Sequence, residues 1–399
     1  MPLVSTALAT LALVPFALAG DPLVSIGAEV VLAPGGGWAR AFPEDVGWTL
    51  VWSAGGDYNA LPMTADLVVD DRDRKHLTGR TDLKDHAIVR CPDGTFLHVG
   101  SANLHVDNDS AYAHRFDAEF NLLASGTVEE DNPNRQHNDP ALICAPVGEA
   151  VAYMDKQGQA SATLFDIAGN GTMTGTRAVD GAPRVMGGGL VWNADDDTFL
   201  IIGGAYDNAL TLARYDIDLN LLDTQKLTAL PAGWHAFWPQ AVMRVGDFWI
   251  LAHAGNDEAV HWDQGDGDIW VKVYDLDWNL IQDEQVTHNT APIGGMRPGL
   301  ARKNEQLLVT YDKSVHPVVI PLTLDLAALG VEGGDTGQWS DPADTDSDGS
   351  EDSAPDSGGD DDDDDDCGCA TNVGAGWSLG GWSLAGMLLL PWWRRRKAS

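Results

Sequence analysis

An apolar strand pattern that ends in an aspartate recurs along the middle of the chain. In each copy an apolar or alternating run stops at an aspartate, a polar turn follows and a second apolar run begins, as in ARYDIDLNLLDTQ and KVYDLDWNLIQDE. The copies are about fifty residues apart, which is the scale of a repeat architecture. The aspartates are Asp70, Asp117, Asp166, Asp216, Asp275 and Asp325.

Each repeat holds four short apolar or alternating runs with polar turns between them, for example AIVRC, TFLHVGS, AYAHRFD and LLASGTV. Runs of this kind predict strands. A unit of four strands cannot bury both faces alone, but radial packing buries them against one another. We therefore predict an all-β domain over residues 20–331, a six-bladed β-propeller; five or seven blades and a two-sheet sandwich are the alternatives.

The two ends of this domain predict how the ring closes. After Asp325 only Leu326 to Val331 remain for a fourth strand, whereas the run LVSIGAEVVLA precedes the first repeat. We expect this N-terminal run to pair into the last repeat, because closure removes exposed strand edges. In four repeats an asparagine follows the aspartate by four residues, and we expect it to take the left-handed turn conformation. These residues are Asn121, Asn170, Asn220 and Asn279.

The N-terminal segment, residues 1–19, reads MPLVSTALATLALVPFALA and has no charged side chain. The Ala17-Leu18-Ala19 step before Gly20 matches the small-residue cleavage pattern of a secretory signal peptide. We predict export and removal of this segment. The alternative is an uncleaved apolar anchor, since no Lys or Arg precedes the apolar run.

The C-terminal segment, residues 367–399, begins with Cys367-Gly368-Cys369 and continues as a charge-free stretch from Ala370 to Trp393. That stretch is long enough to span a membrane as a helix. A basic cluster follows and predicts a cytoplasmic end. It comprises Arg394, Arg395, Arg396 and Lys397.

These three parts together resemble the MYXO-CTERM sorting tail of myxobacterial and related surface proteins. The resemblance covers only the tail. It implies recognition by a membrane sorting protease, a myxosortase, and processing or anchoring at Cys367 or Cys369. We accordingly expect an exported protein that is held at a membrane or at the cell surface.

An acidic spacer, residues 332–366, separates the predicted domain from the tail. Its composition predicts a disordered, extended stalk. Its aspartates include a D-x-D-x-D-G-x-x-D spacing that resembles the calcium loops of thrombospondin type 3 repeats, although an aspartate-rich run gives the same spacing by composition alone, which we favour. No other cofactor is indicated. The four candidate ligands are Asp344, Asp346, Asp348 and Asp352.

The charge of the chain limits its partners. Asp and Glu number 60 against 24 Lys and Arg, for a net charge of −36. No basic patch offsets this balance, so nucleic acid and anionic bilayers are excluded as partners of the domain. The domain has two cysteines, Cys91 and Cys144, each after an apolar run in consecutive repeats. In an oxidising compartment they form either a disulfide or two buried thiols.

Candidate ligand-binding residues come from the connections between repeats. In a propeller these connections gather at one face of the central channel. Their carboxylates, imidazoles, guanidinium groups and indoles suit a sugar. The alternative, which we favour for polar residues in these positions, is that they cap strand ends and tie neighbouring blades together. The ligand-binding candidates are Trp38, His86, His137, Arg184, His235, Trp238 and Arg297, and the catalytic candidates are Asp85 and Asp139.

The longest interval between repeats contains a polar insertion from His253 to Asp268. Its spacing fits no established metal loop, and we interpret it as a solvated acidic loop. The chain has no phosphate loop, dinucleotide fingerprint or H-E-x-x-H motif. Its G-x-S-x-G match, Gly376 to Gly380, lies in the predicted membrane span.

The sequence therefore favours a displayed binding module for an extracellular glycan or protein. One alternative is a polysaccharide hydrolase or lyase that uses Asp85 and Asp139, which would have to face each other across the channel. The other is a structural envelope protein.

Overall fold

The computed structural model describes most of the predicted domain. The chain divides into two units, residues 1–345 and 346–399, and all described residues lie in the first. The predicted signal peptide, acidic spacer and sorting tail, with their candidate residues, lie outside the described residues. The described ranges are 22–32, 35–54, 57–69, 71–78, 83–102, 109–132, 135–146, 148–155, 160–167, 173–174, 188–204, 208–257, 267–289, 295–314 and 316–331.

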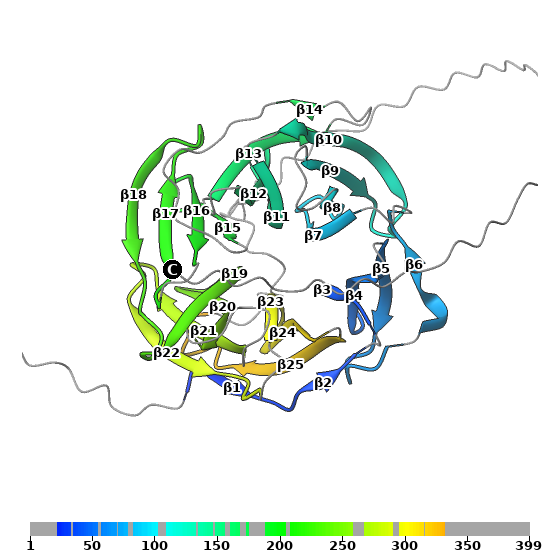
Figure 1. Ribbon diagram of the computed structural model, residues 1–399. Helices are drawn as coiled ribbons and strands as arrows, with labels where there is room; N and C mark the ends of the chain where they lie inside the picture. The colour runs from blue at the N-terminus through cyan, green and yellow to red at the C-terminus, as the bar shows by residue number, and fades with distance from the viewer. Residues whose placement is uncertain are drawn as a thin grey trace, which may run out of the picture. The chain divides into compact units, whose positions relative to one another are not determined.

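The described strands form antiparallel sheets that follow one another along the chain and stand around a common axis (Figure 1). Sheet 1 contains β3 (Gly37–Pro43), β4 (Trp48–Ala54), β5 (Asp57–Met63) and β6 (Lys75–His76). Sheet 2 contains β7 (Leu83–Arg90), β8 (Phe96–Ala102), β9 (Asp109–Phe116) and β10 (Leu122–Asn132). Sheet 3 contains β11 (Arg135–Ala145), β12 (Gly148–Asp155), β13 (Ala160–Ile167) and β14 (Met173–Thr174).

Three more sheets complete the arrangement. Sheet 4 contains β15 (Gly189–Asn193), β16 (Thr198–Gly203), β17 (Thr211–Tyr215) and β18 (Leu221–Lys226). Sheet 5 contains β19 (Trp234–Val245), β20 (Phe248–Asp257), β21 (Asp268–Asp275) and β22 (Leu280–Gln285). Sheet 6 contains β23 (Gly295–Lys303), β24 (Gln306–Lys313) and β25 (His316–Leu324), together with β1 (Val24–Ile26) and β2 (Val30–Val31).

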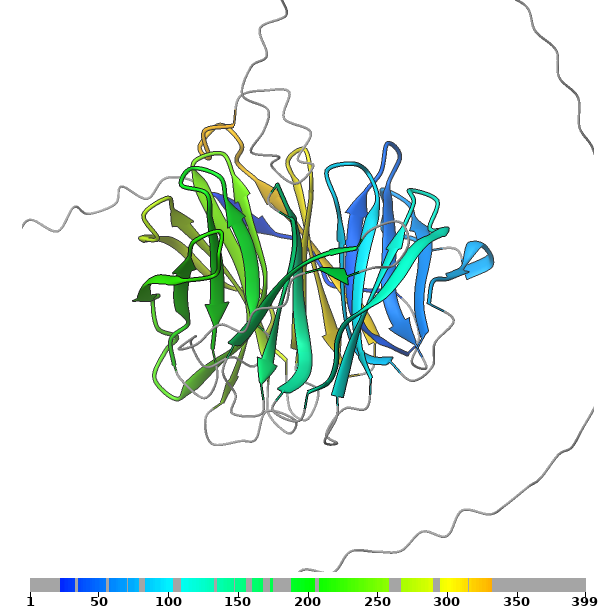
Figure 2. The ribbon, with the colours of Figure 1, turned by 90° about the horizontal axis from the view of Figure 1, so that it is seen from above.

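This arrangement confirms the prediction of an all-β propeller. In each sheet the first strand lies nearest the axis and the following strands lie progressively farther out (Figure 1). The view turned by 90° shows the sheets from the side, standing next to one another (Figure 2). The only helix among the described residues is the single 3₁₀ turn Asp71–Asp73.

The hydrophobic core lies between neighbouring sheets. The strand β16 shows how the sequence produces this, because all its residues are buried. Phe199 and Ile201 pack toward sheet 3, whereas Leu200 and Ile202 pack toward sheet 5. Successive side chains of a strand point to opposite faces, so a continuous apolar run fills two cores at once.

The N-terminal run pairs with the last sheet, so that residues from both ends of the domain lie in one sheet. In β1, Val24 lies opposite Leu324 of β25, and in β2, Val30 lies opposite Val319. Between them Glu29 accepts a hydrogen bond from the Tyr311 hydroxyl at 2.5 Å.

Three of the repeated aspartates, Asp117, Asp216 and Asp275, form turns between the third and fourth strands of their sheets. The Asp275 carboxylate accepts the backbone N–H of Asn279 at 2.8 Å and its side-chain amide at 2.9 Å. The left-handed residue is the one before the asparagine, Trp278, at φ 61°. The expectation for the asparagines is wrong here, because their side chains bind the aspartate and leave the positive φ to the preceding residue. The turns at Asp117 and Asp216 have the same bonds, with Phe120 and Leu219 left-handed; Asn170 lies outside the described residues.

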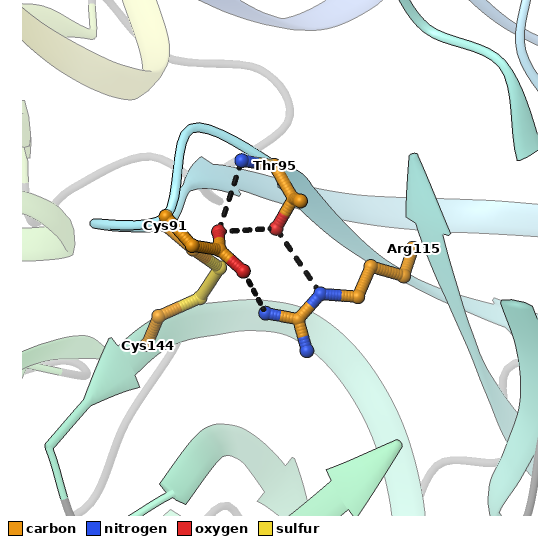
Figure 3. Close-up of a disulfide and its surroundings, with 5 residues drawn as sticks. Cys91, Thr95, Arg115 and Cys144 are labelled. Atoms are coloured by element: carbon orange, nitrogen blue, oxygen red, sulfur yellow. Dashed lines mark hydrogen bonds and ion pairs between the residues drawn. A yellow bond between two sulfur atoms is a disulfide. The ribbon is translucent and has the colours of Figure 1, made fainter. Parts of the chain in front are cut away.

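Cys91 and Cys144 form a disulfide between sheets 2 and 3 (Figure 3). Their Cα atoms are 5.3 Å apart, and Cys91 directly follows β7 while Cys144 lies near the end of β11. Of the two alternatives for these cysteines, the structure has the bond. Beside it the Arg115 guanidinium donates to the Thr95 hydroxyl at 3.1 Å and to the Asp93 carboxylate at 3.3 Å.

Candidate functional site

Bulges in the first strands aim the candidate side chains at the channel mouth. The pairing of β3, β7, β11, β19 and β23 with their second strands shifts register near the start of each strand. Four bulge residues have left-handed backbones, a conformation that costs about 1–3 kcal/mol for a residue other than glycine. A bulge redirects the side chain that it carries. The four are Trp38, Asp139, Trp238 and Arg297, at φ 53°, 46°, 42° and 53°.

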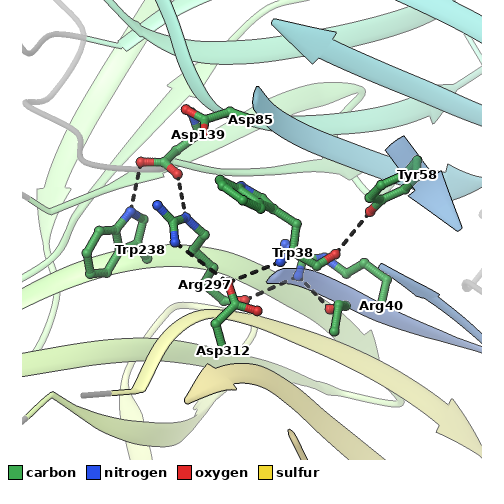
Figure 4. A network of polar contacts seen from close by, with 9 residues as sticks. Trp38, Arg40, Tyr58, Asp85, Asp139, Trp238, Arg297 and Asp312 are labelled. Atoms are coloured by element: carbon green, nitrogen blue, oxygen red, sulfur yellow. Dashed lines mark hydrogen bonds and ion pairs between the residues drawn. The ribbon is translucent and has the colours of Figure 1, made fainter. Parts of the chain in front are cut away.

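These residues meet in one polar network, which we call the channel network (Figure 4). At its centre the Arg297 Nε donates to Asp139 Oδ1 at 2.9 Å, and the Trp238 indole N–H donates to Asp139 Oδ2 at 2.9 Å. Both oxygens of the Asp139 carboxylate are therefore engaged. The bonds join sheet 3 to sheets 5 and 6.

A second carboxylate, Asp312 of β24, belongs to the same network. Its Oδ2 accepts the backbone N–H of Trp38 at 3.0 Å and lies 3.6 Å from the Arg297 guanidinium. Beneath it the Arg40 guanidinium donates to the carbonyls of Ala39 at 2.8 Å and Arg297 at 3.2 Å. Sheets 1 and 6 are thus joined through Asp312 and Arg40 (Figure 4).

The two catalytic candidates, Asp85 and Asp139, are hydrogen-bonded to each other. Asp85 Oδ2 accepts the backbone N–H of Asp139 at 3.0 Å, and the two residues are 5% and 6% exposed. A general acid and base must reach the substrate. Asp85 and Asp139 instead hold the backbone and the cation of the channel network.

Burial and charge set the protonation of the channel network. Burial lowers the pKa of the Arg40 guanidinium. Burial acts the same way on Arg297, but the carboxylates around it raise its pKa above the ordinary value. Burial raises the pKa of the Asp312 carboxyl, and the two guanidinium groups only partly oppose it. Arg297 therefore stays a cation, and burial favours the protonated form of Asp312.

Aromatic rings enclose the Arg297 guanidinium. Its Cζ lies 4.2 Å from the centroid of the Trp38 ring and 5.5 Å from that of Trp238. A cation over an indole face is stabilised by the ring quadrupole. Trp238 is only 2% exposed, whereas Trp38 is half-buried, so Trp38 is the ring that a ligand can reach.

The other candidates are dispersed. His86 is fully buried beneath Trp38, with its ring 5.9 Å from the Trp38 ring in an edge-on contact. His235 is half-buried at the start of β19, 6.1 Å from the Phe237 ring. The side chain of His137 and the whole of Arg184 lie outside the described residues.

Below the channel network the first strands enclose a cavity of about 60 Å³. Its lining comes from all six sheets and is mostly aliphatic, as with Leu142, Val242 and Leu300. Arg40 is the one ionisable side chain among the described lining residues, so the cavity meets the channel network at this residue.

Two absences concern the described residues only. None of their His, Cys, Asp and Glu side chains form a group of three that could hold a metal ion. The insertion residues 258–266 and the candidate calcium ligands Asp344, Asp346, Asp348 and Asp352 lie outside this part. Among the same residues, no helix is long and apolar enough to cross a membrane.

Sequence reasoning missed Arg40, Asp312 and Tyr58, whose hydroxyl donates to the Trp38 carbonyl at 3.0 Å. Arg40 lies two residues after the candidate Trp38. Asp312 follows the apolar run of a second strand, whereas the candidates come from the connections that lead into first strands. One signal was available for the bulges. A proline follows Asp139, Trp238 and Arg297, at positions 140, 239 and 298.

Comparisons with known proteins concern the fold. No protein-family model matches the chain, and no curated protein matches it in sequence. Among solved structures it is similar to a mutant of NanB sialidase from Streptococcus pneumoniae, at 6% identity and a TM-score of 0.49 over 73% of this chain and 70% of that chain. It is also similar to an α-L-arabinofuranosidase from Fusarium graminearum, at 10% identity and a TM-score of 0.45 over 76% and 98%. An α-L-arabinofuranosidase from Podospora anserina gives 9% identity and a TM-score of 0.42 over 74% and 99%. At these values the comparisons carry no argument about substrate.

Proposed function

We propose that the chain is an exported, surface-displayed binding module that recognises a neutral carbohydrate at the mouth of its channel. We take each of the six sheets as one blade of a six-bladed propeller, closed by the N-terminal strand β1. The observation that carries the proposal is the Trp38 indole, half-buried at the mouth and backed by the Arg297 guanidinium at 4.2 Å.

The Trp38 ring has the two properties that a sugar site needs. An indole face stacks on the apolar face of a pyranose ring. The indole N–H of Trp38 also has no acceptor among the described residues. A buried donor without a partner is costly, and a ligand hydroxyl or a bridging water would satisfy it.

The charges around Trp38 favour a neutral ligand. Arg297 and Arg40 supply two positive charges, against which stand Asp85, Asp139 and Asp312. The Arg297 guanidinium is already paired with Asp139 at 2.9 Å. A ligand carboxylate would have to displace that pairing, in a domain whose chain already has a net charge of −36.

A second candidate function is polysaccharide hydrolysis, and one observation favours it. Burial raises the pKa of the Asp312 carboxyl, which is how enzymes keep a carboxylic acid protonated for proton donation. Asp312 would then act as the acid, and Asp85 would have to give up its bond to the Asp139 N–H to act as the base. We rank this second, because Asp312 is 1% exposed and its Oδ2 is held by the Trp38 N–H.

The proposed location rests on the sequence and on the disulfide. The signal-like residues 1–19, the acidic spacer and the tail with Cys367, Cys369 and the Arg cluster suit a displayed protein cut by a sorting protease. The Cys91–Cys144 bond suits an oxidising compartment outside the cytoplasm. Removing residues 367–399 should release the protein into the medium, and continued retention on the cell would contradict the anchor.

Binding and hydrolysis are separated by a paired assay on the full chain. A glycan array identifies a neutral oligosaccharide, and calorimetry then compares wild type with Trp38→Phe, which keeps a ring but removes the N–H. We expect at least tenfold weaker binding by Trp38→Phe. The control is Trp278→Phe, which should bind as wild type does, because Trp278 lies in the turn after β21 and stacks on Trp249 of β20. Absence of any glycan ligand would overturn carbohydrate recognition.

The hydrolase alternative is tested on the same oligosaccharide by release of reducing ends. Turnover that Asp312→Asn abolishes, with binding retained, would establish hydrolysis in place of simple binding. Intact binding without turnover would remove the hydrolase alternative.

A further inference from the structure

Three histidines form a continuous buried line across sheet 2. His86, His98 and His114 come from the consecutive strands β7, β8 and β9, and His98 lies directly opposite His114 in the strand pairing. His86 Nδ1 is 3.0 Å from His98 Nε2, and His98 Nδ1 is 3.3 Å from His114 Nδ1. Their exposed fractions are 0%, 0% and 5%.

Sheet 1 covers this imidazole line. The Tyr58 ring of β5 stacks on His86 at 4.7 Å and lies 4.8 Å from His98. Trp38 of β3 contacts His86. The ring beside His114, Phe116 at 6.2 Å, belongs to sheet 2 itself. The line is therefore part of the contact between the first two sheets.

Among the described residues, no carboxylate lies against His98 to balance an added proton. Its two ring nitrogens both face imidazoles, and the third ring on it is Tyr58, a group whose pKa is raised by burial. Behind Tyr58 lies the Arg40 cation. Asp85, which directly precedes His86 in the chain, directs an oxygen to the backbone N–H of Asp139.

Neutral imidazoles can satisfy the hydrogen bonds of the line, whereas a protonated His98 cannot. A neutral imidazole donates from one nitrogen and accepts at the other, so one order of tautomers satisfies both contacts of His98. A proton added to His98 makes both its nitrogens donors and leaves a charge in the core. Burial, with the neighbouring His86 and His114, lowers the pKa of His98 well below its ordinary value.

We propose that the imidazole line is an acid-sensitive latch between sheets 1 and 2 that releases Trp38 and the channel mouth as the surroundings become acidic. The link to the mouth is direct. Tyr58 covers the line and donates to the Trp38 carbonyl at 3.0 Å, while His86 touches the Trp38 ring. Opening this contact therefore frees the residue that the Asp312 carboxylate holds on its other side.

The sign of the effect follows from linkage. A histidine with a lowered pKa in the folded state binds its proton more readily when the sheets are open. The latch is closed above the ordinary histidine value near pH 6.5, and each such histidine favours opening about tenfold per pH unit below it.

The test compares the full chain with His98→Gln, which keeps a donor and an acceptor but cannot take a proton. Urea unfolding between pH 7.5 and pH 5 gives the unfolding equilibrium constant at each pH. We expect the wild-type constant to rise more steeply below pH 6.5, by up to tenfold per unit relative to His98→Gln. The exposed His288→Gln is the matched control and should keep the wild-type slope. Equal slopes for wild type and His98→Gln would overturn the proposal.

Two measurements on the wild type keep the test decisive if His98→Gln does not fold. Long-range proton–nitrogen NMR spectra of the imidazoles should show His98 neutral in the folded protein at pH 6, and an imidazolium there would overturn the latch. Hydrogen exchange, corrected for intrinsic rates, should lose protection in β3–β5 and β7–β9 before β16 and β17 as the pH falls. Uniform loss across the sheets would overturn the local opening.

Discussion

Arg297 of sheet 6 binds Asp139 of sheet 3 at the mouth of the channel, with 2.9 Å between the guanidinium Nε and the carboxylate Oδ1. The two residues are 158 positions apart, and their sheets stand on opposite sides of the ring (Figure 1). Trp238 of sheet 5 donates to the same carboxylate, and Asp85 of sheet 2 holds the Asp139 backbone. Asp139 therefore connects four sheets that the strand pairing leaves separate, three of them through its carboxylate and the fourth through its backbone N–H.

We expect Asp139→Asn to destabilise the domain by about 3–5 kcal/mol, because it leaves the buried Arg297 cation without its closest partner. Urea unfolding of the full chain measures the change. Asp223→Asn is the control: its pair with Arg214 is exposed, and its loss should cost no more than about 1 kcal/mol. Equal effects for the two substitutions would show that the Arg297–Asp139 pair contributes no more than a surface contact.

Five members of the channel network were predictable from the sequence, but their pairing was not. The repeat fixes which residues stand where one sheet passes to the next, so Trp38, Asp85, Asp139, Trp238 and Arg297 could be selected by position alone. Which of these residues bond to each other depends on the direction in which each bulge points its side chain. The apolar pattern that indicates a strand does not give that direction.

The buried partners were missed for a different reason. Asp312 ends the apolar run of β24 and resembles an ordinary strand terminus before a turn, although it is 1% exposed. His98 and His114 each stand next to apolar residues in an alternating pattern. A strand with one face in solvent shows the same pattern. Only the packing of sheet 1 against sheet 2 determines that this face is buried.

The Cys91–Cys144 bond should stabilise the domain by about 2–4 kcal/mol. The enclosed separation is 53 residues, for which loop closure in the unfolded chain gives about 4 kcal/mol as an upper value. Replacing both cysteines by serine should lower the urea midpoint, and reductant should lower that of the wild type to a similar value. A reductant that shifts the double variant as well would assign the effect to something other than this bond.

His253 in sheet 5 should make a second acid-dependent contribution to the stability of the domain. Burial, with the nearby Lys272, lowers the pKa of His253 to about 3, against about 6.5 in the unfolded chain. Its contribution to stability is complete above pH 6.5 and falls by about 1.4 kcal/mol per unit as the pH decreases toward 3. His253→Asn, which retains a donor for the Ala254 carbonyl, should remove that slope in urea unfolding between pH 6.5 and pH 4. An unchanged slope would mean that His253 is charged in the folded state.

The closure of the ring can be tested within the single strand β1. Val24 is 2% exposed and packs in the core between sheets 5 and 6, whereas Ile26, two residues later, is 42% exposed. Both pair with β25, so their backbone roles match. Val24→Asp buries an unpaired carboxylate and should cost several kcal/mol, whereas Ile26→Asp should cost about 0.5 kcal/mol or less. Thermal unfolding of the two variants measures the difference. If Val24→Asp is as stable as Ile26→Asp, the N-terminal strand does not contribute to the core between sheets 5 and 6.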